Sequence, residues 1–152
     1  MTSKPTNQKA EVSSALLDVP AFALSRLGRL AHATVHDAFA GGGLSSRTYF
    51  VLRCLHEDGQ MSQRELADRV SMDRSDLVKL LDQLENVGHL RRGPDPRDRR
   101  RHLLSITPRG VTIVEQGRRL LDQANEEVFA SLNPNERATL HHLVRRALHA
   151  LA

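Results

Sequence analysis

Two short segments near the middle of the chain carry the signals that start and stop helices, and only Val70-Ser71-Met72 separates them. Ser62-Gln63-Arg64-Glu65 fits a capping box, in which the Ser hydroxyl and the Glu carboxylate satisfy backbone N–H groups at the start of a helix. Asp73 is placed to cap a second helix that runs through Val87 and is closed by Gly88. Two capped helices joined by so tight a turn predict a helix-turn-helix.

The second helix of this pair has an apolar face and a polar face. Its apolar side chains recur at steps of three and four residues, so we expect them to pack inward. They are Leu77, Leu80, Leu81, Leu84 and Val87. The side chains left facing outward are Ser75, Val78, Lys79, Asp82 and Asn86.

In a helix-turn-helix the second helix lies in the major groove of DNA, with its first turns against the base edges. Ser75 and Lys79 can donate to guanine or phosphate acceptors, and Val78 can touch a thymine methyl group. We also expect DNA contacts from Ser62, Arg64 and Arg74. The negative charges of Asp76 and Asp82 are unfavourable beside a polyanion. Asp76 instead interacts favourably with the N-terminal end of the helix dipole, or accepts a hydrogen bond from a cytosine amino group.

The positive charge of the chain is concentrated just after these helices. Residues 91–101 read RRGPDPRDRRR, and without them the 22 Lys+Arg and 18 Asp+Glu of the chain become 16 and 16. The flanking residues 89–92 and 101–106 are short enough to be two strands with a Pro-containing turn between them. Helix-turn-helix followed by such a hairpin is a winged helix. A charge run is often only a solvated loop, but its place in a winged helix favours phosphate binding.

The arginines of this wing would lie in the minor groove next to the major groove that the reading helix occupies. A narrow minor groove concentrates negative potential and attracts inserted Arg. The wing residues that we expect on DNA are Arg92, Arg97, Arg99 and Arg100.

Composition and periodicity predict a mainly α protein with one small β-hairpin. The chain has 152 residues, 39% of them hydrophobic and 3% aromatic, which suits one helical domain. A helix ends at Gly41-Gly42-Gly43, and another follows Leu44-Ser45-Ser46 with Tyr49, Leu52 and Leu55 inside and Gly59 at its end. The apolar positions of the first of these two helices are Leu24, Leu27, Leu30, Ala31, Thr34 and Ala38.

Two more helices are expected after the wing. Thr107-Pro108 and Asn133-Pro134-Asn135-Glu136 are start signals, and Gly117 slightly weakens the first of these helices. The apolar stripe of that first helix is Val111, Val114, Leu120, Leu121, Ala124, Val128 and Leu132. The stripe of the last helix is Leu140, Leu143, Val144, Ala147, Leu148 and Leu151.

A winged helix does not need this much additional apolar helix, so a second copy of the chain is expected to cover it. We divide the chain into a disordered tail (1–13), a helical dimerisation region (14–40 and 107–152) and a winged helix-turn-helix (44–106). A two-fold dimer presents its reading helices to successive turns of double-stranded DNA, ~34–36 Å apart, and so predicts a pseudo-palindromic site.

The run ELADRVSMDRSDLVKLLDQLENVGHLRRGPDPRDRRRHLLSITPRG resembles the MarR family of transcription regulators, above all Asp98-Arg99-Arg100 followed by Leu-Ser-Ile-Thr-Pro-x-Gly. The resemblance extends over most of residues 20–151. It implies an obligate homodimer that represses, or occasionally activates, nearby genes. It also implies that Arg99 enters the minor groove, that Asp98 and Arg100 brace the wing, and that Lys79 reads a base; Asp76 departs from a position often held by Ser or Thr.

Members of this family often lose DNA affinity when a small aromatic or anionic effector binds between the dimer helices and the winged helix. Arg29, His32 and His36 form one stripe on the first helix, with Arg26 beside it, and a cation with imidazoles can hold a carboxylate or phenol. The alternative is a polar stripe that only faces solvent. Both interpretations stay open from the sequence.

Other site types have weaker support. Cys54 is the only cysteine, which excludes a disulfide within the chain and favours a small buried hydrophobe over a peroxide-sensitive thiol. The His residues lack acidic or Cys partners for a metal, and we find no enzyme motif. No signal peptide or membrane span is evident, so we expect a cytoplasmic protein. A winged helix that docks proteins, or binds nucleic acid without sequence choice, remains the alternative function.

Overall fold

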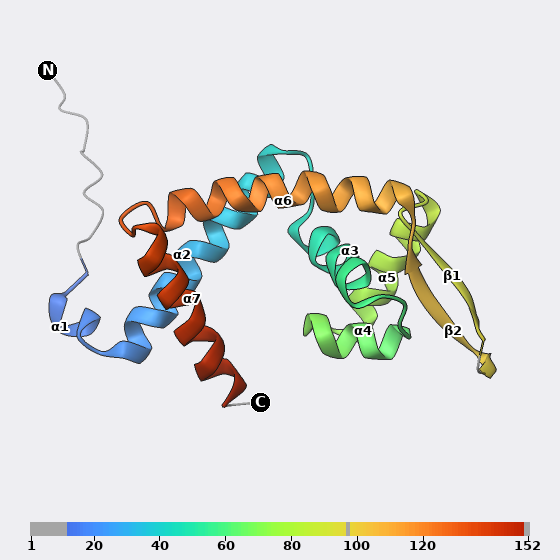
Figure 1. The fold of residues 1–152 in the computed structure, drawn as a ribbon, viewed down its shortest axis with the longest axis horizontal. Coiled ribbons are helices and arrows are strands. Elements are labelled where there is room, and N and C mark those ends of the chain that lie inside the picture. Colours follow the sequence, from blue (N-terminus) through green and yellow to red (C-terminus); the bar gives the residue numbers. More distant parts are fainter. Residues whose placement is uncertain (1–11, 97, 151–152) are drawn as a thin grey trace, which may run out of the picture.

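One long helix joins the two ends of the molecule in the computed structural model, which describes residues 12–96 and 98–150, and for Arg99–Arg101 the backbone alone. One end holds α1 (Ser14–Leu17), α2 (Pro20–Gly41) and α7 (Pro134–His149), and the other is a winged helix (Figure 1). The winged helix comprises α3 (Ser46–Asp58), α4 (Gln63–Val70), α5 (Arg74–Asn86), β1 (Leu90–Asp95) and β2 (Asp98–Ile106). The connecting helix is α6 (Pro108–Val128). This mainly helical architecture with one hairpin confirms the predicted fold class.

The hydrophobic core lies mainly inside the winged helix, and Phe39 of α2 and Val114 of α6 pack into it. Tyr49, Leu52 and Leu55 of α3 are buried as expected, and Leu90 and Leu104 bring the base of the hairpin into the same cluster. Met61, just before α4, pairs with Leu104 through both backbone groups, at N···O distances of 2.8 and 3.3 Å. The root of the wing is therefore fixed to the helices by buried apolar contacts and by backbone hydrogen bonds.

The helix boundaries follow the start and stop signals, with three differences. The predicted stripe of the first helix after the wing reaches Leu132, but α6 ends at Val128 and Leu132 lies in the turn before α7. The first predicted helix is broken at Asp18 and Val19, because Pro20 starts α2 afresh at its first position. Val87 does not face inward as expected; α5 ends at Asn86, and Val87 is exposed in the turn that leads to Gly88, whose φ is +75°. A helical wheel extended one residue too far predicts the wrong face for Val87.

The strands of the wing are longer than expected. Arg92 pairs with Leu104, Gly93 with Leu103 and Pro94 with His102, so the ladder reaches well into the Gly-Pro-Asp segment. A two-stranded sheet has two free edges, and an edge position tolerates a Pro that cannot donate a hydrogen bond. The register shifts between Pro94 and Asp95, close to the tip.

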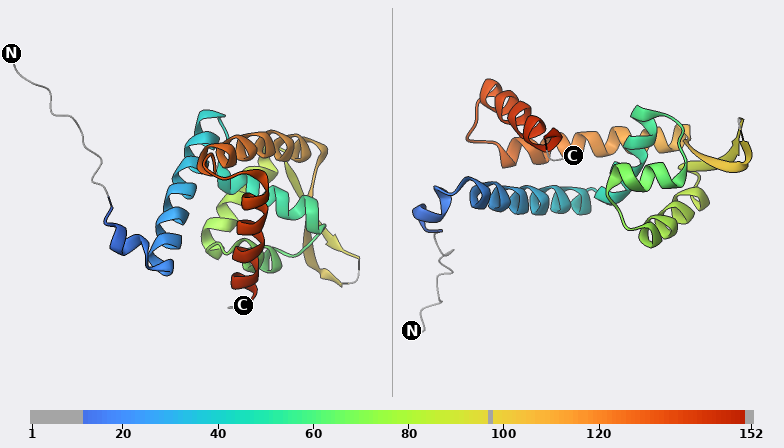
Figure 2. Two further views of the ribbon diagram at one scale, coloured as in Figure 1. Left: turned by 60° about the vertical axis from the view of Figure 1, so that its left-hand side comes forward. Right: turned by 90° about the horizontal axis from the view of Figure 1, so that it is seen from below.

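The helical end of the molecule leaves its apolar side chains uncovered. The C-terminal part of α2 lies against α6 (Figure 2). By contrast, α7 buries none of its residues, and the exposed fraction of Leu148 is 61%. The other large exposed apolar side chains of α1, α2, α7 and the α1–α2 turn are Leu16, Leu17, Val19, Leu24, Leu30, Leu143 and Val144. A search of the described residues finds no helix long and apolar enough to cross a membrane.

Two parts of the sequence predictions concern residues that the structure does not describe. The predicted disordered tail lies outside the described residues except for Val12 and Ser13, and Leu151 of the last stripe lies outside them too.

Candidate nucleic-acid interface

The turn between α4 and α5 is held by caps on both sides. The Ser62 hydroxyl accepts from the Glu65 N–H, and Glu65 Oε2 accepts from the Ser62 N–H at 2.8 Å, which confirms the capping box. Ser71 ends α4 in the left-handed region with φ 50°, and Asp73 then caps α5. These local interactions fix the angle at which α5 leaves the turn.

The two faces of α5 are divided as the helical wheel predicts, apart from Val87. Leu77, Leu81 and Leu84 are buried, and Leu80 is half-buried. The five predicted outward side chains, Ser75, Val78, Lys79, Asp82 and Asn86, are all exposed. Arg74, the first residue of α5, and Arg64 on α4 are exposed as well. The structure thus brings most of the predicted contact residues to one end of the molecule.

The hydroxyl of Ser75 is already used as a donor. Ser75 Oγ donates to Asp73 Oδ1 at 2.5 Å, and the same oxygen accepts the backbone N–H groups of Ser75 and Asp76. The hydrogen bond from the Ser75 side chain, followed by those from the two backbone groups, holds the pKa of Asp73 below its usual range. The ionised carboxylate therefore accepts the hydroxyl hydrogen of Ser75, which leaves the lone pairs of Ser75 Oγ exposed, and the predicted DNA contact of Ser75 stays a prediction.

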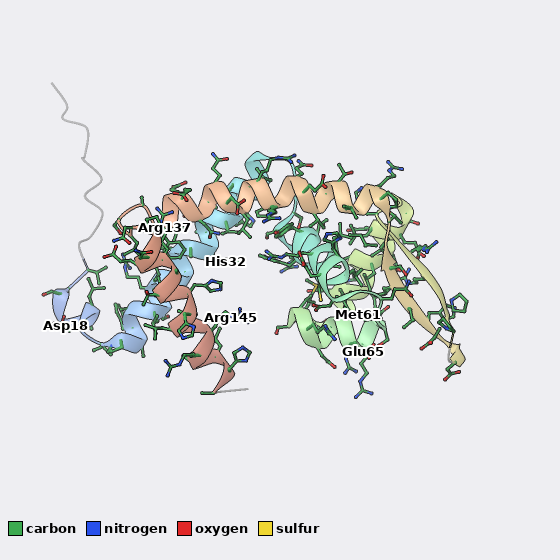
Figure 3. All side chains as sticks on the ribbon, viewed as in Figure 1. Asp18, His32, Met61, Glu65, Arg137 and Arg145 are labelled. Carbon is green, nitrogen blue, oxygen red and sulfur yellow. The ribbon has the colours of Figure 1, made fainter. Side chains whose placement is uncertain are left out.

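Ser62 is also engaged within the protein. Its hydroxyl donates to Glu65 Oε2 at 2.7 Å while it accepts from the Glu65 N–H. Figure 3 shows Met61 and Glu65 on the winged-helix side of the molecule. The position is suitable for the predicted DNA contact, but the side chain is committed to the cap of α4.

Arg92 has partners that the sequence does not reveal. Its guanidinium donates through Nη1 to Glu85 Oε2 and through Nη2 to Asp82 Oδ1 at 2.7 Å, and its backbone N–H donates to Glu85 Oε1 at 3.0 Å. Burial lowers the pKa of Arg92, but the hydrogen bonds to Asp82 and Glu85 outweigh it and leave the pKa above its usual range. In the structure without DNA, Arg92 therefore lies against α5, and its predicted contact with DNA stays a prediction.

The tip of the wing carries the remaining predicted contacts. Asp98 opens β2 opposite Asp95. Arg97 lies outside the described residues, and only the backbone of Arg99 and Arg100 is described, as part of β2. Their predicted roles in the minor groove and in bracing the wing stay predictions.

The proposed effector stripe lies on α2. Arg29 donates to Ser25 Oγ at 2.7 Å, His36 lies 3.4 Å from Asp37, and His32 is exposed on the helical side of Figure 3. Arg26 is half-buried. None of these four residues lines the cavity of about 1370 Å³ between α3, the α4–α5 turn and the end of α7, which includes Arg47, Arg53 and Arg145. Nor do they line a cavity of about 420 Å³ between α2 and α6.

Cys54 is half-buried against the core, in line with the expectation from its sequence context. Burial, and then the hydrogen bond from its thiol to Asp58 at 3.5 Å, raise the pKa of Cys54. The neutral thiol is therefore favoured. In the described part of the chain, no three His, Cys, Asp or Glu residues are grouped so as to hold a metal ion.

Comparisons with known proteins agree with this arrangement. Residues 44–102 match the model of the MarR family. A putative transcriptional regulatory protein for the hcr operon of Thauera aromatica is 34% identical over 68% of this chain and 63% of its own length, so the match spans less than two thirds of that relative. The multiple antibiotic resistance protein MarR of Salmonella typhimurium is 31% identical over 69% of this chain and 74% of that protein.

A solved structure extends the likeness to nearly the whole chain. The PcaV transcriptional regulator from Streptomyces coelicolor, in complex with its natural ligand, is 29% identical and gives a TM-score of 0.71. The likeness covers 94% of this chain and 99% of that one.

Proposed function

This chain belongs to the MarR family of transcription regulators, and on that basis we propose that it is a dimeric, sequence-specific DNA-binding regulator, released from DNA by a small-molecule effector. The observation that carries the proposal is the exposed face of α5 beside a projecting hairpin whose sequence is rich in arginine. A surface that combines base-reading side chains with concentrated positive charge suits duplex DNA. We propose that such a regulator acts in the cytoplasm, in contact with the DNA that it binds.

The exposed apolar side chains of the helical end support the dimer. Fully burying an exposed Leu or Val side chain contributes about 1.5–3 kcal/mol, and the partly exposed Leu143, Val144 and Leu148 of α7 would each contribute part of that amount. We therefore assign residues 14–40 and 107–152 to dimerisation and 44–106 to DNA binding. The two-fold axis then places the two copies of α5 on successive turns of a pseudo-palindromic site.

The residues proposed to contact DNA are those expected from the sequence, with changed roles for two of them. Lys79 and Val78 face the bases, Arg64 and Arg74 approach phosphates, and the arginines of the wing tip enter the neighbouring minor groove. Ser75 contributes an acceptor, and Arg92 contacts the protein itself in the absence of DNA.

The effector is proposed to be small and aromatic or anionic. The ligand-bound PcaV relative supports a small-molecule site in principle. Arg26, Arg29, His32 and His36 remain the proposed anchors because a partner protomer that covers α2 would turn an exposed stripe into the wall of a pocket. Substituting Arg26 and His32 by Ala and titrating phenolic acids tests this assignment, and an unchanged release of DNA would exclude both residues.

A salt titration with two duplexes tests the central proposal. A sequence-specific regulator prefers a selected pseudo-palindromic duplex over a scrambled one by ~10³-fold or more, whereas a general nucleic-acid binder shows almost no preference and a protein-docking module binds neither. Arg99→Ala should weaken binding and lower the slope of log Kobs against log salt by about one unit for each phosphate that is no longer neutralised. An unchanged slope would contradict the role of the wing.

A further inference from the structure

Arg92 links the wing to the reading helix. It is the third residue of β1, and both its backbone N–H and its guanidinium bond to carboxylates on α5. Asp82 and Glu85 are three residues apart and therefore lie on one face of the helix. One side chain thus holds two turns of α5 and one strand of the wing together.

The contacts of Arg92 bear on the direction of the wing. Leu90 and Leu104 anchor the root of the hairpin in the core, whereas the far ends of β1 and β2 project away from the helices (Figure 1). A projecting two-stranded ribbon takes its direction from its base. The contacts of Arg92 lie between the buried root and the projecting tip, so they constrain the angle between the wing and α5.

The same contacts offset negative charge on the DNA-facing helix. The Asp82 side chain is 56% exposed and follows Val78 by one helical turn, on the face that approaches the bases. An unpaired carboxylate at that position would repel phosphates across the groove. The paired guanidinium compensates part of the charge of Asp82 and Glu85, which explains how an acidic pair is tolerated on a reading helix.

We infer that Arg92 is a positioning residue of the DNA interface: it fixes the wing to the reading helix and neutralises Asp82 and Glu85 instead of contacting phosphate. This inference rests on the proposed function. The competing role is the direct phosphate contact that an arginine at the base of a wing would otherwise be expected to make.

The two roles give opposite results when the carboxylates are removed. We propose to measure the full-length Asp82→Asn/Glu85→Gln variant against a duplex selected from a random pool and against scrambled DNA. With Arg92 as a positioning residue, the preference for the selected duplex falls about 10-fold or more, while binding to scrambled DNA is unchanged or tighter. If Arg92 binds phosphate, the freed guanidinium tightens binding to the selected duplex and the preference is retained, which would overturn the inference.

Coupling to the wing tip gives a second readout that a purely structural role would not change. In the Arg92→Gln background, Arg99→Ala should cause a smaller loss of DNA affinity than in the wild type, because a misdirected wing no longer brings Arg99 to the groove. If both arginines contacted phosphates independently, their losses of affinity would be additive. The matched control is Arg91→Gln, an exposed arginine on the opposite face of the same strand, which should leave the cost of Arg99→Ala unchanged.

A conservative variant separates charge from geometry. Arg92→Lys keeps the positive charge but replaces the planar fork by one ammonium group, which cannot hold both carboxylates in the same way. Its preference for the selected duplex should be as low as that of Arg92→Gln. A preference restored to the wild-type level by Lys would contradict the inference. Thermal unfolding identifies any variant that fails to fold. If the wild-type chain itself does not distinguish the two duplexes, the proposed function fails before the role of Arg92 is tested.

Discussion

Gly117 of α6 lies directly against the ring of Tyr49 in α3, and a Cβ atom at position 117 would overlap that ring. Tyr49 is fully buried, lies 5.2 Å from the ring of Phe39 between centroids, and accepts a hydrogen bond from Arg53 at 3.0 Å. The missing side chain therefore lets α6 approach the winged helix closely.

Gly117→Ala should destabilise the protein even though Ala is the better helix former by about 1 kcal/mol. Overpacking a rigid buried ring costs about 1–3 kcal/mol, which exceeds the gain in helix propensity. Urea unfolding at fixed protein concentration measures the free energy of unfolding. Gly41→Ala is the control because nothing lies within 4 Å of its added methyl group. Equal stability of the two variants would show that the Tyr49 contact is unimportant.

Ser75 should accept a hydrogen bond from a base amino group, because its hydroxyl hydrogen is already donated to Asp73. Amino groups in the major groove belong to adenine N6 and cytosine N4. Replacing the contacted adenine by purine, or cytosine by 2-pyrimidinone, should weaken wild-type binding about 10-fold, as expected for one lost hydrogen bond to a buried partner. The same replacement should have little effect on Ser75→Ala. If Ser75→Ala instead abolished the wild type's sensitivity to 7-deazaguanine, Ser75 would be a donor to guanine N7 and the assignment would be reversed; Lys79→Ala is the control expected to lose sensitivity to that analogue.

Leu148→Glu should separate the dimer. Leu148 is 61% exposed on α7, and a second protomer that covers it would bury an unpaired carboxylate in the variant. Such a charge costs several kcal/mol, which corresponds to a rise of at least about 100-fold in the dimer dissociation constant. Sedimentation equilibrium measures this constant. Gln83→Ala, at an exposed position of α5 outside the proposed dimerisation region, should leave it unchanged. A stable dimer of the Leu148 variant would place the interface elsewhere.

Acid should weaken the cap of α5 through Asp73. Its pKa is lowered in the folded chain, so its contribution to stability is complete above the ordinary value of ~3.9 and is lost as the pH falls through the lowered value. Asp73→Asn keeps a capping oxygen without the ionisation. The free energy of unfolding of the wild type should therefore fall more steeply than that of the variant from about pH 5 downward. Parallel curves would mean that Asp73 does not titrate differently on folding.

Features encoded by neighbouring residues could be predicted from the sequence. The caps at Ser62, Asp73, Thr107 and Asn133 each depend on residues within three positions, and all four are confirmed. The apolar periodicity likewise gives the faces of α5, except at Val87, where the end of the helix changes the geometry.

Contacts between distant elements could not be predicted in this way. The sequence indicates only that Gly117 weakens its helix slightly, because nothing local shows that Tyr49 packs against it. Arg92 looks like the other wing arginines, although its spacing from Glu85 places a carboxylate within reach once the strand turns back along α5. The hydrogen bond from Ser75 to Asp73 is local, but the helical wheel describes direction and not hydrogen-bond polarity.

The unbroken length of α6 has a mechanical consequence. At its start, the Thr107 hydroxyl donates to Gly88 O at 2.7 Å beside the wing; beyond its other end, Arg137 of α7 donates to Phe129 O and Leu132 O. Its 21 residues make a rod of about 30 Å. Pivoting such a lever by about ten degrees around one end sweeps the other through about 5 Å. A slight tilt near α7 therefore shifts the winged helix by a distance that is large compared with the ~12 Å width of the major groove.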